Sequence, residues 1–144
     1  MAQILKISEA ANLGFHAMLM MAEDPDRRVT TRDIAERFEV SEFHLSKILQ
    51  RLKSAGLLKS VRGPQGGFTL NRSPSEITLL EVFENIEGHL EPTKCLLNSP
   101  LCGRKECIFG GLLLNVNREI ADYLKETRLS DLVSSGKKRK AGKR

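Results

Sequence analysis

Apolar side chains recur every three or four residues over three segments in the first half of the chain, the spacing of helices that bury one face. The first segment follows Ser8 and runs to about Ala22, the second follows Thr30, and the third follows Ser41 and ends at Gly56. Ser and Thr are favoured just before a helix, because their side-chain oxygens accept hydrogen bonds from its first N–H groups. Only a short turn separates the second segment from the third, so the pattern predicts a helix-turn-helix.

After Gly56 the helical period ends, and a glycine-rich segment divides two short apolar runs. Leu57 to Val61 and Phe68 to Leu70 flank the sequence RGPQGG at 62–67. Short apolar runs on either side of a glycine-containing turn are typical of a β-hairpin. We therefore predict a small hairpin wing beside the helix-turn-helix.

Two further helices are predicted downstream, with an irregular loop between them. Thr78 and Glu81 have the spacing of a capping box, and the helix that they begin stops at Gly88. Residues 89–106 show no periodicity. A helix is predicted from about 108 to 125, and its apolar stripe is long for a lone surface helix.

The pattern as a whole predicts a mainly α fold. A winged helix-turn-helix domain with a small β-hairpin wing is expected over residues 1–75. The irregular loop and the long C-terminal helix are expected over residues 76–135. Residues 136–144 contain no apolar residue larger than alanine, so this tail is expected to be disordered.

Size and composition exclude several classes of protein. The 144 residues are 40% hydrophobic and 28% charged, as in one ordinary domain rather than a large multidomain enzyme. No stretch approaches the ~18 consecutive apolar residues of a membrane span, and the first residues lack the pattern of a secretory signal. No Ser-His-Asp arrangement, catalytic carboxylate pair or cofactor motif is found. We expect a cytoplasmic protein that has no membrane partner and is not an enzyme.

The formal net charge of +5 is distributed unevenly along the chain. Residues 43–75 carry six basic side chains and no acidic one, whereas residues 1–42 and 76–135 are both net acidic. The tail, 136–144, carries six more basic side chains. Because the acid-free segment coincides with the helix-turn-helix and the wing, it predicts contact with the phosphate backbone of double-stranded DNA.

The second helix of a helix-turn-helix lies in the major groove, where its first turns reach base edges. Lys47 is expected to reach guanine and Gln50 adenine, while Arg51 is placed for a phosphate contact. Arg62, at the base of the wing, is expected to enter the minor groove. The predicted DNA-binding residues are Ser41, Glu42, His44, Ser46, Lys47, Gln50, Arg51, Arg62, Gly63 and Gln65.

Two other interpretations of these residues are available. The charged positions would be an ordinary solvated helix face, were it not for their coincidence with the acid-free segment. The glycine-rich sequence at 62–67 would cradle a nucleotide phosphate in some folds. Nucleotide binding is disfavoured here, because no Gly-Lys-Ser/Thr ends the sequence and a predicted strand follows it.

The three cysteines of the chain lie close together in the irregular loop. Cys95, Cys102 and Cys107 have the spacing C-x6-C-x4-C. Thiolates this close in sequence can converge on a soft metal centre, either zinc or an iron–sulfur cluster of the 2Fe–2S or 4Fe–4S type. Zinc usually binds cysteine pairs at C-x2-4-C spacing, which the loop lacks, so a cluster is favoured. Three unrelated thiols, or thiols that are themselves oxidised, are the alternatives.

Three cysteines leave the coordination of such a centre incomplete. The fourth ligand is then another residue type, a residue of a partner chain, or absent. The candidates are Glu9, Asn12, His16 and His89. Any single histidine is more often a structural group than a ligand.

Together these residues resemble the Rrf2 family of winged helix-turn-helix transcriptional regulators, over about residues 5–133. The resemblance rests on the segment from Asp33 to Phe68, on ITLLEVFENIEG at 77–88, on the three-cysteine loop and on RLSDLV at 128–133. The loop is typical of the cluster-binding subgroup, which includes IscR-like and NsrR-like regulators. The resemblance implies a homodimer formed through the long helix and an operator bound by the helix-turn-helix and wing. It also implies cluster ligation by the three cysteines and a transcriptional output, with repression expected.

The chain departs from the patterns of this family at four positions. Cys102 divides the interval between the outer cysteines into six and four residues rather than five and five. Gly110 stands where IscR-like proteins place a histidine ligand, and Asn12 stands where NsrR-like proteins use an aspartate from the partner's first helix. Ser46 replaces a glutamate of IscR-like recognition helices. The fourth ligand and the operator preference of relatives therefore do not transfer to this chain.

The sequence supports one main hypothesis and two rivals. The main hypothesis is a transcriptional repressor whose iron–sulfur cluster senses nitric oxide, redox state or iron–sulfur status. The first rival keeps DNA binding but senses oxidants through the thiols alone. The second is an iron–sulfur electron carrier or cluster-transfer protein.

Overall fold

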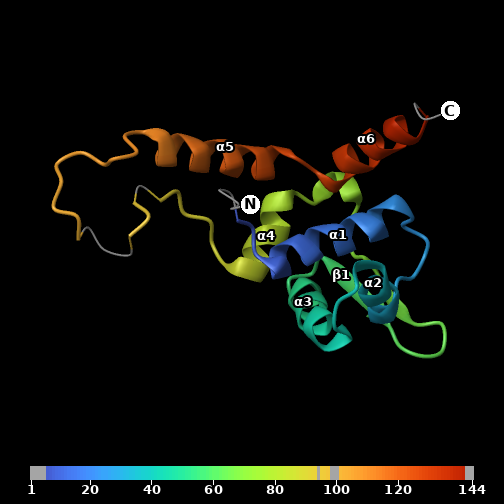
Figure 1. Cartoon of the computed structure of the whole chain (residues 1–144). Helices are drawn as coiled ribbons and strands as arrows, with labels where there is room; N and C mark the ends of the chain where they lie inside the picture. The colour runs from blue at the N-terminus through green and yellow to red at the C-terminus, as the bar shows by residue number, and fades with distance from the viewer. Residues whose placement is uncertain (1–5, 94, 98–100, 142–144) are drawn as a thin grey trace.

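The computed structural model describes residues 6–93, 95–97 and 101–141 (Figure 1). Within these residues the fold is mainly helical with one two-stranded antiparallel sheet, as predicted. The elements in chain order are α1 (Glu9–Glu23), α2 (Thr31–Phe38), α3 (Glu42–Ser54), β1 (Leu58–Val61), β2 (Gly67–Leu70), the 3-10 turn η1 (Pro74–Glu76), α4 (Leu79–Glu87), α5 (Leu112–Glu126) and α6 (Leu129–Ala141). No described helix is both long and apolar enough to cross a bilayer.

The helices begin at the caps predicted from the sequence. Thr30 accepts a hydrogen bond from the backbone of Asp33, whose carboxylate accepts one from the Thr30 N–H in return. Thr78 and Glu81 form the same reciprocal pair at the start of α4. The other two predicted caps, Ser8 and Ser41, each accept a hydrogen bond from the first turn of the following helix.

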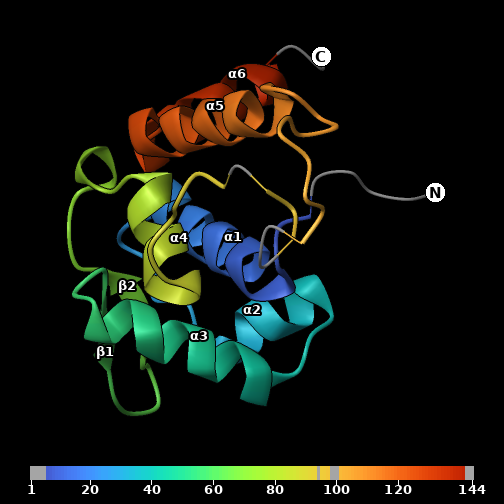
Figure 2. The same cartoon turned by 90° about the vertical axis from the view of Figure 1, so that its left-hand side faces the viewer.

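The helix α1 forms the centre of the core and packs against α3, α4 and α6. Figure 2 shows the resulting arrangement, with α2, α3 and the hairpin on one side of α1 and α5 and α6 on the other. Met18 and Met21 of α1 and Leu45 and Leu49 of α3 are fully buried. Burying side chains of this size contributes roughly 1.5–3 kcal/mol each, so this packing fixes the orientation of α3.

The hairpin is attached to the helical body through the turn between α1 and α2. Its strands pair from Leu58 with Leu70 to Val61 with Gly67, and Val29 exchanges two backbone hydrogen bonds with Phe68. Gly67 has φ +143°, and a Cβ at this position would lie 3.0 Å from the Val29 carbonyl oxygen. Glycine is therefore required where the wing meets the body.

The C-terminal region differs from the prediction in two ways. The helix α5 begins at Leu112 rather than near 108, and a further helix, α6, continues to Ala141. The expectation that 136–144 is disordered is therefore wrong as far as Ala141, and 142–144 lie outside the described residues. Leu129 anchors α6 in the core, fully buried, and lysine and arginine have good helix propensity, so a helix begun there continues into the basic segment.

The capping box of α2 makes stability depend on pH. Hydrogen bonds from the Thr30 backbone and side chain hold the pKa of Asp33 below its ordinary value of 3.8. Because the folded-state pKa is the lower one, the stabilisation is present above the unfolded-state pKa and is lost as pH falls through the folded-state pKa. We expect Asp33→Asn to lower the free energy of unfolding by about 0.5 kcal/mol at pH 7, and the deficit to shrink below pH 4.

Urea unfolding followed by circular dichroism at pH 7 and pH 3 measures this difference. Asp26→Asn, which removes an exposed carboxylate from the preceding turn, is the control and should show no such trend. An equal deficit for Asp33→Asn at both pH values would contradict the assignment.

Candidate nucleic-acid interface and cysteine loop

The predicted recognition helix α3 presents one face to solvent along its length. Its buried stripe consists of Leu45, Ile48, Leu49 and Leu52. Every predicted DNA-binding position on α3 and its cap is exposed except Ser46, which is half-buried; the exposed positions are Ser41, Glu42, His44, Lys47, Gln50 and Arg51. The outward face is therefore accessible from the side opposite the core.

An aromatic residue that the sequence analysis did not include also lies on this face. Phe43 is 73% exposed, and the Lys47 Nζ lies 4.4 Å from the centroid of its ring. This cation–π contact between residues one turn apart orients the Lys47 ammonium group toward the N-terminal end of α3. The sequence did carry a signal for this residue, because Phe43 lies outside the apolar stripe of the predicted recognition helix.

Arg51 links α3 to the end of α4. Its Nη1 donates a hydrogen bond of 2.7 Å to the carbonyl oxygen of Ile86, in the last turn of α4. A guanidinium group has five N–H donors, so the remaining ones are free for a phosphate. The residue predicted as a phosphate contact therefore also joins the recognition helix to the helix that leads into the cysteine loop.

The tip of the wing is held by an arginine that the sequence analysis did not single out. Arg28 Nη1 donates a 2.8 Å hydrogen bond to the carbonyl oxygen of Gln65. The wing residues Arg62, Gly63 and Gln65 are all exposed. The position of the wing relative to α3 thus depends on a contact between segments 37 residues apart, which the local pattern could not reveal.

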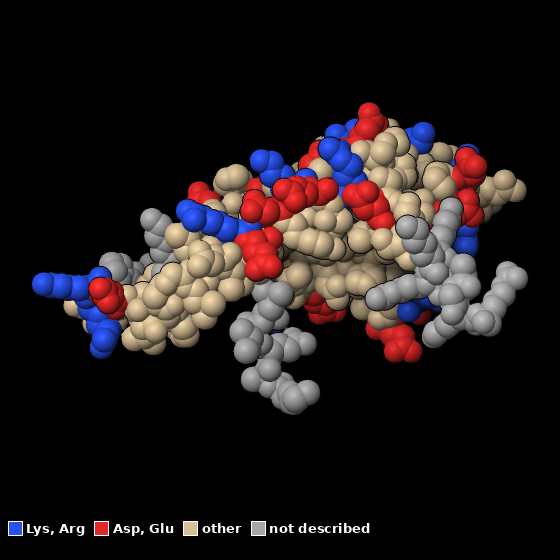
Figure 3. Space-filling model, turned by 90° about the horizontal axis from the view of Figure 1, so that it is seen from above, with Lys and Arg blue, Asp and Glu red and all other residues tan. Residues whose placement is uncertain are grey.

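Charge is distributed differently on the two sides of the molecule. The acid-free segment 43–75 comprises nearly all of α3 and both strands of the wing. Figure 3 shows the side occupied by α5 and α6, where acidic and basic side chains are intermingled. A polyanion is therefore expected to approach the side formed by α3 and the wing.

The three cysteines line a single pocket of about 390 Å³. All three are free thiols; Cys95 is half-buried, while Cys102 and Cys107 are exposed. The pocket is also lined by Leu96, Leu97, Arg104, Ile108 and Phe109. The structure thus brings together the three residues that the sequence analysis singled out, in an apolar setting with one basic group.

Two of the sulfur atoms already accept backbone hydrogen bonds. The N–H of Leu97 donates to Cys95 Sγ at 3.4 Å, and the N–H of Phe109 donates to Cys107 Sγ at 3.5 Å. Hydrogen bonds of this kind stabilise metal-bound thiolates and set the reduction potential of iron–sulfur clusters. The donor set is soft, as a cluster requires, although no three metal-binding side chains of the described residues are arranged as a formed metal site.

The candidate fourth ligands lie outside this pocket. His89 Nδ1 pairs with Glu84 Oε1 at 2.8 Å, and His16 Nδ1 is 2.8 Å from the Asn12 carbonyl oxygen. Glu9 and Asn12 are exposed on α1. Within the described part of one chain, none of the four lines the pocket of the cysteines.

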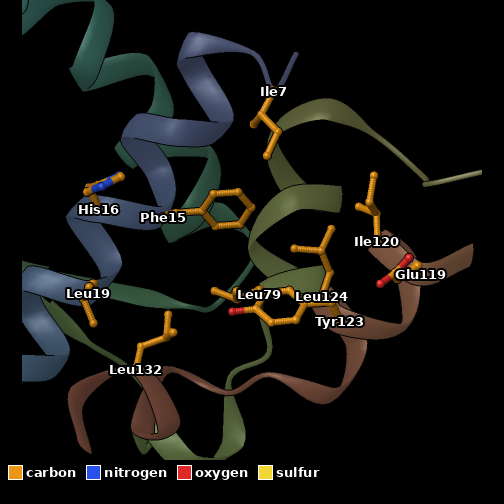
Figure 4. Close-up of a pocket in the computed structure, with 10 residues that line it drawn as sticks. All are labelled: Ile7, Phe15, His16, Leu19, Leu79, Glu119, Ile120, Tyr123, Leu124 and Leu132. Atoms are coloured by element: carbon orange, nitrogen blue, oxygen red, sulfur yellow. The ribbon is translucent and has the colours of Figure 1, made fainter. Parts of the chain in front are cut away.

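A second, apolar groove of about 520 Å³ lies between α1 and the C-terminal helices. Figure 4 shows Phe15 of α1 facing Leu79 of α4 and Tyr123 and Leu124 of α5 across this groove. Of the residues of α5, Leu124 alone is buried. The long apolar stripe predicted for this helix is therefore largely uncovered in a single chain.

A comparison with protein families identifies one match that spans most of the chain. The model of the Rrf2 family, described as iron-dependent transcriptional regulators, matches residues 7–135. The chain is 29% identical to the transcriptional regulator IscR of Photorhabdus laumondii over 91% of this chain and 80% of that protein. It is 37% identical to the putative regulator BadM of Rhodopseudomonas palustris, over 58% of this chain but only 53% of the relative.

Solved structures of such regulators have the same fold. CymR, the global cysteine regulator of B. subtilis, superposes with a TM-score of 0.75 and 28% identity, over 92% of this chain and 98% of that one. T. potens IscR superposes with a TM-score of 0.72 and 29% identity, over 92% and 89%. An oxidized form of Staphylococcus aureus CymR superposes with a TM-score of 0.69 and 25% identity, over 90% and 96%.

Proposed function

The chain belongs to the Rrf2 family of transcriptional regulators, and from this premise we propose that it is a homodimeric, DNA-binding repressor controlled by an iron–sulfur cluster. The observation that carries the proposal is the arrangement of two surfaces. An acid-free, exposed recognition helix and wing lie on one side, and three free thiols that line one pocket lie in the loop that follows α4.

DNA binding follows from the exposed face of α3 and from the wing. Inserted into the major groove, α3 places Lys47 against guanine O6 or N7 and Gln50 against adenine. Arg51 and Lys53, in the last turn of α3, contact phosphates, and Arg62 enters the minor groove. Two such modules in a dimer bind a pseudo-palindromic operator with half-sites one turn of DNA apart.

The homodimer is supported by the uncovered stripe of α5. Leu112, Val116 and Tyr123 are 56%, 40% and 57% exposed, and their spacing of four and seven residues places them on one face of the helix. Tyr123 also lines the groove against Phe15. A second copy of α5 covers this stripe and groove together, which one chain leaves in water at a cost of about 25 cal/mol per Å² of apolar area.

The regulatory step depends on the connection between the cysteine loop and the helices. Cys95, Cys102 and Cys107 would hold the cluster as thiolates, and the fourth position would be left to a non-cysteine group or to the partner chain. When bound, an iron–sulfur cluster supplies an iron centre that reacts with oxidants and nitric oxide. While the three thiolates are held together, the loop fixes the position of the start of α5. When the thiolates are released, α5 can shift within the proposed dimer, and this changes the distance between the two recognition helices.

A thiol redox switch without a metal is the second candidate. The observations in its favour are the exposure of Cys102 and Cys107 as free thiols and the similarity to a CymR that has an oxidized form. In this case hydrogen peroxide converts a thiol to a sulfenic acid, with water as the second product. A second thiolate then displaces hydroxide from that sulfur and forms a disulfide.

The DNA-binding face predicts the effect of removing a single charge. We expect Lys47→Ala to lower operator affinity about tenfold, because a base contact is lost. Arg62→Ala should also weaken binding, and should lower the slope of log K against log salt by about one if its charge neutralises a phosphate. Fluorescence anisotropy with an operator selected from random duplexes, at several salt concentrations, measures both.

Lys125→Ala removes the same charge from the last turn of α5, away from α3, and serves as the control. Unchanged binding by both Lys47→Ala and Arg62→Ala would show that the assigned face is wrong.

If the proposed cluster is bound, the protein should be coloured and should contain iron in a fixed ratio to protein. Protein purified without oxygen from iron-replete cells should show visible charge-transfer absorption and contain iron and sulfide, and Cys107→Ala should lose all three because one thiolate ligand is missing. Leu101→Ala changes a loop residue that is 82% exposed and does not line the pocket, so it should retain them.

A colourless, iron-free wild-type protein from the same preparation would contradict the cluster and favour the thiol switch. Mass spectrometry after treatment with peroxide would then locate the oxidised cysteines, and DNA binding would remain.

The dimer predicts that a charge on the exposed stripe of α5 separates the subunits. We expect Val116→Glu to convert the dimer to a monomer, because the interface would bury an unpaired carboxylate. Sedimentation velocity measures the mass. Lys125→Glu introduces the same side chain at an exposed position nine residues after Val116, on the opposite face of α5, and should remain dimeric; a monomeric wild-type protein would contradict the assembly.

A further inference from the structure

One exposed aromatic side chain is separated from the other apolar surface of the molecule. Among the described residues, most of the exposed large apolar side chains lie in the cysteine loop and on α5: Leu96, Leu97, Leu101, Ile108, Phe109, Leu112, Val116 and Tyr123. Phe43 and Val61 instead lie on the side formed by α3 and the wing. Phe43 is the more exposed of the two, at 73% against 43%.

The position of Phe43 on α3 places it among the base-reading residues. It follows the N-cap Ser41 by two residues, in the turn that enters the major groove first. Residues three, four and seven positions further along a helix share its face. These are Ser46, Lys47 and Gln50, so the phenyl ring belongs to the face that we propose to read the operator.

The contact with Lys47 fixes how the ring is presented. The Lys47 Nζ lies 4.4 Å from the ring centroid, so the charged group and the ring lie side by side on this face. The free part of the ring adjoins the point where Lys47 would meet a guanine. A single ring without apolar neighbours on α3 is too small for a protein docking surface, but its size suits one methyl group.

The major groove offers one apolar group on a base edge, the C5-methyl group of thymine. We propose that Phe43 is a specificity-determining residue that contacts the C5-methyl group of a thymine, next to the guanine contacted by Lys47. The inference rests on the proposed insertion of α3 into the major groove. It predicts an operator in which each half-site contains a guanine and a neighbouring thymine, on either strand.

Replacing thymine by deoxyuridine tests this contact, because it removes the methyl group and leaves all hydrogen-bonding groups in place. Wild-type protein first selects a duplex from a random pool, and each thymine of that duplex is then replaced in turn. At one thymine per half-site, deoxyuridine should lower wild-type affinity about fourfold, the fold change for one buried methyl group.

The variants assign the effect to the ring. Phe43→Ala should bind the thymine and deoxyuridine duplexes equally at that position, whereas Phe43→Leu should retain part of the discrimination, because it keeps apolar contact without the ring. Val61→Ala removes an exposed apolar side chain from the wing and should discriminate like the wild-type protein. Thermal unfolding should show all variants folded, because both side chains are exposed.

The outcomes separate the inference from the function on which it rests. Equal thymine-to-deoxyuridine ratios for wild type and Phe43→Ala at every position would overturn the inference and leave DNA binding standing. Failure of the wild-type protein to select any sequence would contradict the proposed function itself, and the inference with it.

Discussion

The burial of one face of α3 against α1 is the constraint on which the rest of the molecule depends. Leu45, Ile48, Leu49 and Leu52 are all within the core. The remaining positions of the helix are therefore exposed, except for the half-buried Ser46. Rotation of α3 by one residue would place the Lys47 side chain in the position of Ile48, which lies beside Gly14 of α1. The cost of burying an ammonium group there forbids this rotation. Hydrophobic packing thus determines which side chains are available for the proposed contact with DNA, although the packed residues themselves are turned away from that face.

This constraint also determines how the cysteine loop can influence the recognition helix. The thiols lie outside the core, and the loop residues from Leu101 to Gly110 are all exposed, so core packing does not transmit a change in them. A change in the loop can therefore reach α3 only through the chain on either side of the loop and through the contacts of that chain. The loop joins the end of α4 to the start of α5, and the hydrogen bond from Arg51 to the Ile86 carbonyl ties α3 to that end of α4.

The sequence predicted the features that are determined locally and missed those that depend on distant segments. Caps, the stripe of α3 and the hairpin follow from neighbouring residues, and all were confirmed. The hydrogen bond between Arg28 and Gln65 joins segments 37 residues apart, and no local sequence pattern links these two segments. The helix α6 was missed because its anchor is a single leucine, Leu129. Its burial and the hydrogen bond from its N–H to the Ile77 carbonyl depend on a distant segment of the chain.

The cysteine site illustrates the same division in its chemistry. Spacing alone brought the three thiols into one prediction, and the structure places them around one pocket. The fourth ligand has no local pattern, and His16 and His89 are both engaged elsewhere in the chain, with the Asn12 carbonyl and Glu84. Because none of the four candidates lines the pocket in the described part of one chain, the fourth position of the proposed cluster is left to a rearrangement of the chain, to the partner's first helix or to a small molecule. The last possibility would leave the iron open to the signal that it senses, so an incomplete ligand set is compatible with a sensor and poorly suited to a purely structural centre.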